Sequence, residues 1–112
     1  MNKQLQNSVD MAEKFRAIGH PVRVAILKVL CNCGCSKLKV KNIYEALNLD
    51  QPSTSRHLDI MRQAGVLERQ RIGNDTFYYF CLSNPEVRCI KNCFDAPLSE
   101  AEQTIIALNE NE

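Results

Sequence analysis

Thiol side chains are the residues of this sequence whose types and spacing most directly suggest chemistry. Six cysteines occur in 112 residues. Five of them form two groups that we take as candidate metal-binding or redox residues: Cys31, Cys33, Cys35, Cys89 and Cys93. The first three alternate in a short polar stretch that contains a glycine, and the last two are four residues apart, which places their sulfur atoms on one face of a helix. The sixth, Cys81, stands among aromatic residues and is expected in the core.

Clustered thiolates suit soft ions, so the candidate ligands are As(III), Cd(II), Pb(II), or Zn(II) held by four sulfur atoms. Three sulfur atoms would satisfy a trigonal arsenic centre, and iron–sulfur ligation is a further chemical option. The alternative is a disulfide or polysulfide bridge between the two groups, formed in response to oxidant or sulfide. We prefer the metal or metalloid interpretation, because five clustered thiols exceed what one bridge needs.

The rest of the composition places these thiols in a reducing compartment. The N-terminus is polar rather than a secretion signal, and no apolar run approaches the roughly 20 residues of a membrane helix. We therefore expect a cytoplasmic protein with no membrane partner, whose cysteines are not a disulfide framework. The length suits one compact domain, assigned to residues 1–96, followed by a helical extension over residues 97–112.

A second set of polar residues lies at the start of a helix predicted over residues 51–64. Asp50 is a suitable N-cap, Pro52 fits the first turn, and Gly65 ends the helix. A short helix over residues 40–47 and a tight connection precede it, which is the helix-turn-helix arrangement. The inward-facing residues are expected to be Thr54, Leu58, Ile60 and Met61.

The exposed end of this helix would then carry the side chains that read DNA: Gln51, Ser53, Ser55 and Arg56. Helix-turn-helix proteins present this end to base edges in the major groove of double-stranded DNA. Gln and Arg can form paired hydrogen bonds with adenine and guanine, and serine can bond bases or phosphates. His57 lies between the exposed and inward faces, and either contacts a phosphate or packs.

In residues 66–82 the pattern changes to a period of two, which predicts a β-hairpin with strands over residues 66–71 and 76–82 and a turn at Ile72-Gly73-Asn74-Asp75. Arg69 and Arg71 are expected beside its turn, where a basic wing would reach the minor groove or the DNA backbone. The other predicted elements are helices over residues 8–18 and 21–30, a loop over residues 31–36, a helix after Pro85, and a final helix from Ser99. The predicted fold is mainly α with a β-hairpin wing, a winged helix-turn-helix.

The formal net charge is only +1, but its distribution favours a polyanionic partner. Residues 14–72 carry 11 Lys or Arg against 4 Asp or Glu, whereas residues 73–112 carry 2 against 7. A basic first part and an acidic second part indicate one face for nucleic acid. Lys37, Lys39 and Lys41 would add phosphate contacts.

Three motifs together resemble the ArsR/SmtB family of bacterial metal- and stress-sensing repressors. They are Ala-x-x-His-Pro-x-Arg at residues 17–23, Gln-Pro-x-x-Ser-Arg-His-Leu at residues 51–58, and Gly-Val-Leu-x-x-x-Arg-x-Gly at residues 65–73. The resemblance spans about residues 10–92. It implies a homodimer formed through the N-terminal and post-wing helices, which represses an operator until an inducer loosens DNA binding. It also implies DNA contacts at Gln51, Ser53, Ser55, Arg56 and, less directly, His57.

The resemblance leaves the inducer open, because this sequence departs from two familiar sensor arrangements. A Cys-x-Cys pair before the reading helix would fall on Lys39 and Lys41, which carry no thiol. Zinc ligands on the post-wing helix would include histidine, which that helix lacks. Family members that sense reactive sulfur pair a cysteine of the second helix with one of the post-wing helix, which Cys31 with Cys89 or Cys93 would resemble.

Other function classes fit the sequence less well. A thiol oxidoreductase needs Cys-x-x-Cys, which is absent, and no phosphate-binding glycine loop or catalytic triad can be assembled. We therefore expect that the chain is not an enzyme. A metal-buffering or interaction module is disfavoured, because Gln51, Ser53 and Arg56 are present at the reading end.

Overall fold

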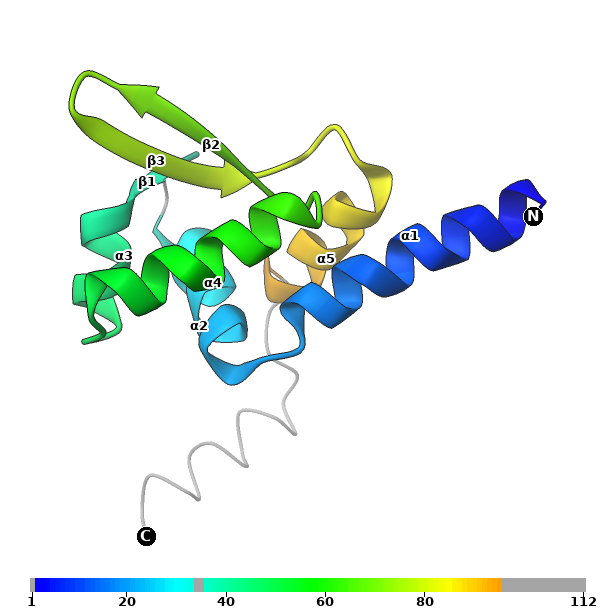
Figure 1. The fold of residues 1–112 in the computed structure, drawn as a ribbon, viewed down its shortest axis with the longest axis horizontal. Coiled ribbons are helices and arrows are strands. Elements are labelled where there is room, and N and C mark those ends of the chain that lie inside the picture. The colour runs from blue at the N-terminus through cyan, green and yellow to red at the C-terminus, as the bar shows by residue number, and fades with distance from the viewer. Residues whose placement is uncertain (1, 34–35, 96–112) are drawn as a thin grey trace, which may run out of the picture.

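A computed structural model describes residues 2–33 and 36–95 of the 112-residue chain (Figure 1). Its elements, in chain order, are α1 (Lys3–Ile18), α2 (Pro21–Asn32), β1 (Leu38–Lys39), α3 (Val40–Ala46), α4 (Gln51–Gln63), β2 (Leu67–Ile72), β3 (Asp75–Phe80) and α5 (Pro85–Asp95). This order confirms the predicted mainly helical fold with one hairpin. The predicted boundary after residue 96 and the final helix from Ser99 lie outside the described residues.

The first two helices extend further than their apolar periodicity predicts. The Asn2 side chain accepts the N–H of Leu5 at 2.8 Å, so α1 begins at Lys3 although residues 3–7 are mostly polar. The predicted loop over residues 31–36 is wrong at its start, because α2 continues through Cys31 to Asn32. Cys31 packs against the core, and that contact allows the last turn of α2 to persist.

The hairpin lies in a three-stranded antiparallel sheet of order β1-β3-β2. Ile72 pairs with Asp75 across a two-residue turn, in which Gly73 has φ +62, a value that favours glycine. β1 was not predicted, since two residues are too few for strand periodicity. Its pairing of Leu38 with Tyr78 joins the start of α3 to the wing.

The core lies beneath α4, between it and α2, α3 and α5. Thr54, Leu58 and Met61 are fully buried, which confirms the inward face predicted for α4, but Ile60 is wrongly placed there because 37% of it is exposed. The rest of the core comes mainly from Ile26, Leu27, Ile43, Val66 and Val87. In the part of the chain that the structure describes, no helix has both the length and the apolar character needed to cross a bilayer.

Much of α1 projects from the body of the molecule (Figure 1). Its apolar side chains Leu5 and Phe15 are each 56% exposed, and Met11 is 42% exposed. At 3.6 residues per turn these three side chains fall within an arc of about 120°, which makes one broad stripe of the helix apolar and uncovered.

Candidate nucleic-acid interface

The N-terminal end of α4 is set by a side-chain cap. The Asp50 carboxylate accepts the backbone N–H of Ser53 at 2.8 Å, which satisfies a donor that the helix itself leaves unpaired. That N–H, and then the Ser53 hydroxyl, lower the pKa of Asp50 below its ordinary value. The hydroxyl of Thr54 also donates to the Asp50 carbonyl oxygen at 2.9 Å. The cap therefore begins the helix at Gln51 and leaves Gln51 exposed.

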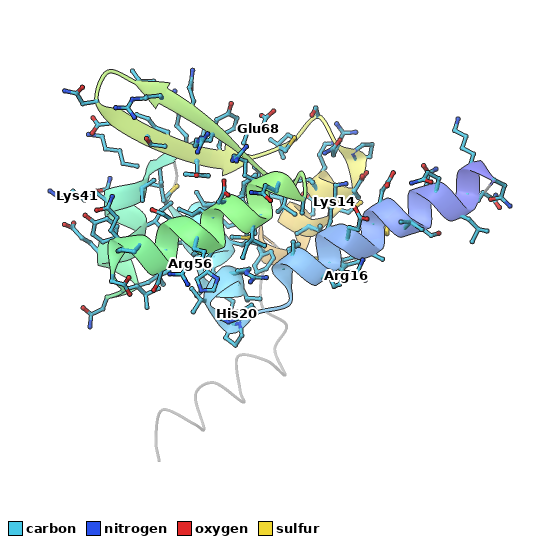
Figure 2. All side chains as sticks on the ribbon, viewed as in Figure 1. Lys14, Arg16, His20, Lys41, Arg56 and Glu68 are labelled. Carbon is cyan, nitrogen blue, oxygen red and sulfur yellow. The ribbon has the colours of Figure 1, made fainter. Side chains whose placement is uncertain are left out.

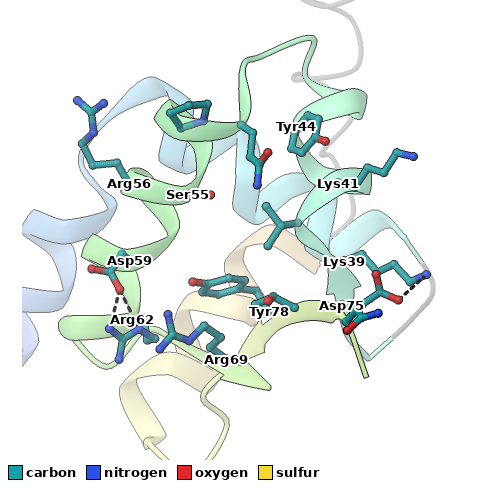
Figure 3. A pocket seen from close by; sticks show the side chains of 15 residues that line it. Lys39, Lys41, Tyr44, Ser55, Arg56, Asp59, Arg62, Arg69, Asp75 and Tyr78 are labelled. Atoms are coloured by element: carbon teal, nitrogen blue, oxygen red, sulfur yellow. Dashed lines mark hydrogen bonds and ion pairs between the residues drawn. The ribbon is translucent and has the colours of Figure 1, made fainter. Parts of the chain in front are cut away.

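An open groove of about 800 Å³ runs between α4, the wing and the start of α3 (Figure 3). Cationic side chains outnumber carboxylates along it, five to two. The cations are Lys39, Lys41, Arg56, Arg62 and Arg69, and the carboxylates are Asp59 and Asp75. Gln51, Ser55, Tyr44, Thr76 and Tyr78 supply hydrogen-bonding groups to the same walls. Such a combination of positive charge and donors suits a phosphate-bearing strand.

Both groove carboxylates are matched by cations. Arg62 donates to Asp59 at 2.6 Å and 3.0 Å, and this contact lowers the pKa of Asp59 and raises that of Arg62. Lys39 lies 3.3 Å from Asp75. Both pairs appear as dashed contacts in Figure 3. The carboxylates therefore orient neighbouring cations while the groove as a whole remains positive.

The structure brings together four of the seven residues predicted to bind DNA. Gln51, Ser55, Arg56 and Arg69 line the groove. Arg69 pairs with Tyr78 in the middle of the hairpin, so its predicted place beside the turn is wrong, whereas Arg71 lies two residues before Gly73. The backbone N–H of Ser53 donates to Asp50, and Ser53 is not among the residues that line the groove.

The seventh residue, His57, packs against the start of α2. Its Nδ1 accepts a hydrogen bond from Nε of Arg23 at 3.2 Å, and its ring centroid lies 4.7 Å from that of His20. Burial lowers the pKa of His57, and the nearby charges of His20, Arg23 and Arg56 lower it further. The sequence left two roles open for His57, a phosphate contact or packing within the fold. In the structure His57 packs against Arg23 and His20.

Several groove residues were not among the predicted site residues, Arg62, Tyr44 and Tyr78 among them. Arg62 follows Ser55 by seven positions, a spacing that returns to the same helical face, so helical periodicity could have found it. Tyr44 and Tyr78 were read only as parts of a helix and a strand, and an aromatic residue in such a pattern gives no signal of DNA contact. Tyr78 is 4% exposed, yet it forms part of the groove floor.

The described thiols lie away from this groove. Cys31 and Cys33 are half-buried at the end of α2, and the Cys33 thiol donates to the Leu30 carbonyl oxygen at 3.2 Å. Cys89 and Cys93 are exposed on α5, and none of the described cysteines is in a disulfide. Cys81 is buried, as predicted, beside the Ser83 hydroxyl at 3.3 Å. Cys35 lies outside the described residues.

Thiols have the donor chemistry that soft ions require. The helix α2, which contains Cys31, packs against α5, which contains Cys89 and Cys93. Within residues 2–33 and 36–95, however, no three His, Cys, Asp or Glu side chains are close enough to hold a metal ion. The described cysteines therefore provide pairs of sulfur donors, and no complete metal site is formed among the described residues.

A helix-turn-helix formed by α3 and α4, with a β-hairpin beside its exposed end, defines a winged helix-turn-helix protein. The model of the arsR family of bacterial regulatory proteins matches residues 20–69. An uncharacterized HTH-type transcriptional regulator of Methanocaldococcus jannaschii is 40% identical over 68 residues, covering 61% of this chain and 74% of that protein. The chain belongs to the ArsR family of bacterial regulatory proteins.

Further relatives agree with this assignment. The HTH-type transcriptional repressor SmtB of Mycobacterium tuberculosis is 38% identical over 66 residues, which cover 59% of this chain but only 47% of that repressor. Among solved structures, the transcriptional repressor PagR of Bacillus anthracis superimposes with a TM-score of 0.68 at 32% identity, covering 80% of this chain and 97% of PagR. These relatives are named as regulators, in keeping with the expectation that the chain is not an enzyme.

Proposed function

We propose that this protein is a cytoplasmic transcriptional repressor that binds double-stranded operator DNA as a homodimer. One observation carries the proposal: the capped, exposed end of α4 adjoins a groove in which five cations face two carboxylates. The bare net charge of +1 would not predict such a surface. The family membership and the repressor names of its relatives support the same function.

The exposed end of α4 would enter the major groove. There Gln51 and Arg56 can form paired hydrogen bonds with adenine and guanine, while Ser55 bonds a base or phosphate. One DNA strand would follow the cationic groove past Arg62 and Arg69, and Arg71 would bring charge to the minor groove or backbone. Ser53 and His57 stay candidates of lower rank, because both already have partners within the fold.

The uncovered apolar stripe on α1 supports the homodimer. Leu5, Met11 and Phe15 are too exposed for a helix that stays in water, and a second copy is the occupant that the family resemblance implies. α5 is the second helix proposed for the interface. Two α4 helices would then read half-sites one DNA turn apart, roughly 34 Å.

The test is selection of duplexes from a randomised DNA library by the purified protein. We expect recovery of an inverted repeat and a dimer in sedimentation on the selected duplex. Arg56→Ala should weaken the preference, whereas Lys28→Ala, which removes an exposed cation of α2, should leave it unchanged. A monomeric protein that selects no sequence, or equal losses for both variants, would overturn the proposal.

We also propose that two groups of thiols form the effector site, one at and just beyond the end of α2 in the sequence and one on α5, with Cys31, Cys33, Cys35, Cys89 and Cys93 as the candidate residues. A thiophilic ion such as As(III), Cd(II), Pb(II) or Zn(II) is the first candidate, supported by the exposed Cys89–Cys93 pair and the packing of α2 against α5. The second is a disulfide or polysulfide bridge that joins Cys31 to α5. Ion binding or bridge formation would each change the orientation of α4, the proposed reading helix, relative to α5.

A titration of DNA affinity decides between the two chemistries. Under reducing conditions, release of DNA by As(III) or Cd(II), with a loss of about 5- to 150-fold in affinity, supports ion binding. Release only by oxidant or polysulfide supports the bridge. The double variant Cys89→Ser/Cys93→Ser should block release, and Cys81→Ala is the matched control. Unchanged release in the double variant would remove α5 from the effector site.

A further inference from the structure

The C-terminal end of α4 is held at a junction with α1 and the start of α5. Four residues make up this junction, which we call the α4 anchor: Lys14, Gly65, Asn84 and Glu86. In Figure 2, Lys14 lies where α1 passes the end of α4. The anchor is at the opposite end of α4 from Gln51.

Lys14 is the charged centre of the anchor. Only 8% of the residue is exposed, and its Nζ lies 3.1 Å from a carboxylate oxygen of Glu86. The Glu86 backbone N–H, and then Lys14, lower the pKa of this carboxyl group. Desolvation offsets much of the attraction in an ion pair that is partly withdrawn from water, so such pairs contribute little net stability. The structural consequence of the Lys14–Glu86 pair is a direct contact between α1 and the start of α5.

Asn84 connects the start of α5 to the C-terminal end of α4. Its side-chain amide donates to the carbonyl oxygen of Gly65 at 3.2 Å, and its own carbonyl oxygen accepts the N–H of Val87 and Arg88 at the start of α5. A methyl group placed on Gly65 would lie 3.5 Å from both Asn84 Nδ2 and Lys14 Cε. The backbone that leaves α4 is thus enclosed by Lys14 of α1 and by Asn84, the residue that precedes α5.

We propose that Lys14 and Asn84 are positioning residues for operator binding, which hold the reading helix at a fixed angle to α1 and α5. The inference rests on the proposed function, in which α1 and α5 join the two protomers. The spacing between the two exposed ends of α4 depends on that angle, since α4 is a rigid helix held at its far end. The anchor therefore determines which half-site spacing the dimer accepts.

The experiment uses the full-length protein and the duplex that it selects from a randomised library. Copies of that duplex carry one base pair inserted or deleted at the centre of the repeat, which changes the half-site separation by about 3.4 Å. For the wild-type protein we expect each change to lower affinity about tenfold or more. For Lys14→Met and Asn84→Ala we expect less than about a threefold loss, together with weaker binding to the original duplex.

Glu86→Gln keeps the size of the side chain and removes the ion pair, so it tests the same contact if Lys14→Met fails to fold. Lys28→Met is the matched control and should keep the wild-type spacing profile. All proteins are compared at concentrations at which sedimentation shows dimers. A merely structural role would weaken binding equally at every spacing, and that result in Lys14→Met, or in Glu86→Gln in its place, overturns the inference. A wild-type protein that selects no duplex overturns the proposed function itself.

Discussion

The two ends of α4 lie in opposite surroundings. At the first end, Asp50 caps the helix, and Gln51 and Arg56 are exposed beside the cationic groove. At the other end, the N–H of Val66 donates to the carbonyl oxygen of Met61 at 2.9 Å across Gly65, and the α4 anchor surrounds the turn. α4 therefore has one exposed end, where the proposed DNA contacts lie, and one end that is enclosed by α1 and the start of α5.

The difference between the two ends also separates effects on the free energy of DNA binding from effects on the free energy of unfolding. Side chains at the exposed end bury little surface within the fold, so their replacement should change DNA affinity and leave the free energy of unfolding almost unchanged. Groups at the fixed end contact α1 and α5, so their replacement should change stability as well. The following predictions test this separation.

The largest effect is expected at the exposed end. Gln51→Ala and Arg56→Ala should each weaken binding to the selected duplex by about 1–3 kcal/mol, because each removes a paired contact to a base. Fluorescence anisotropy with the selected and a scrambled duplex measures the loss. Gln51→Ala removes no charge, so it should change the affinity for the scrambled duplex much less. Equal losses on both duplexes would show that Gln51 does not read bases.

The next effect is expected at the fixed end. Gly65 has φ +84, and the α4 helix ends there with the hydrogen-bond pattern of a left-handed C-terminal turn. Gly65→Ala should lower the free energy of unfolding by about 1–2 kcal/mol, because a side chain makes that backbone conformation unfavourable. Urea unfolding measures the change.

Gly19→Ala is the matched control for this prediction. Gly19 also follows a helix, but its φ is −70, which any residue adopts. Its substitution should therefore leave stability almost unchanged. A Gly65→Ala variant as stable as the Gly19→Ala variant would show that the turn after α4 can rearrange.

Much of α4 could be predicted from local sequence. Asp50, Pro52 and Gly65 mark its ends, and the burial of Thr54, Leu58 and Met61 follows helical periodicity. The hairpin could also be predicted, because a turn that includes Gly73 and Asn74 separates two segments with the two-residue period typical of strands. These features depend on residues close together in the chain, so their physical causes are visible in a short stretch.

Contacts between distant residues could not be predicted in this way. Lys14 and Glu86 meet across 72 positions, and neither has a local pattern that indicates a buried partner. Arg23 and His57 are likewise joined only by the packing of α2 against α4. The cationic groove was predicted in part, through Lys39, Lys41, Arg56 and Arg69. The inclusion of Tyr78 depends on how the sheet lies beside α4, which a short stretch of sequence does not indicate.

A smaller effect is expected from the cap at the exposed end. Asp50→Ala removes the acceptor for the Ser53 N–H, so the first turn of α4 should loosen, with a modest loss of both stability and specific DNA affinity. Asp50→Asn keeps an acceptor oxygen and should restore most of the loss. Because the folded-state pKa of Asp50 is lowered, its contribution is present above pH 3.8 and is lost as the pH falls through the lower, folded value. Thermal unfolding of the three proteins between pH 7 and pH 3 checks this.

The smallest effect is expected at His57, midway between the two ends. Its pKa is lowered by burial and by the charges of His20, Arg23 and Arg56, so the folded state binds its proton less readily than the unfolded chain. The resulting contribution to stability is present above about pH 6.5 and declines as the pH falls through the folded-state value.

His57→Gln isolates this contribution, since the amide oxygen can accept from Arg23 but does not titrate. Between pH 7 and pH 5 the free energy of urea unfolding should fall more steeply for the wild-type protein than for this variant. Contributions from the carboxylates cancel in the difference between the two curves. Parallel curves would mean that the proton enters without disturbing the Arg23 contact. In that case a positive charge on His57 would not weaken the contact between α4 and α2. The orientation of α4 would then depend on the α4 anchor alone.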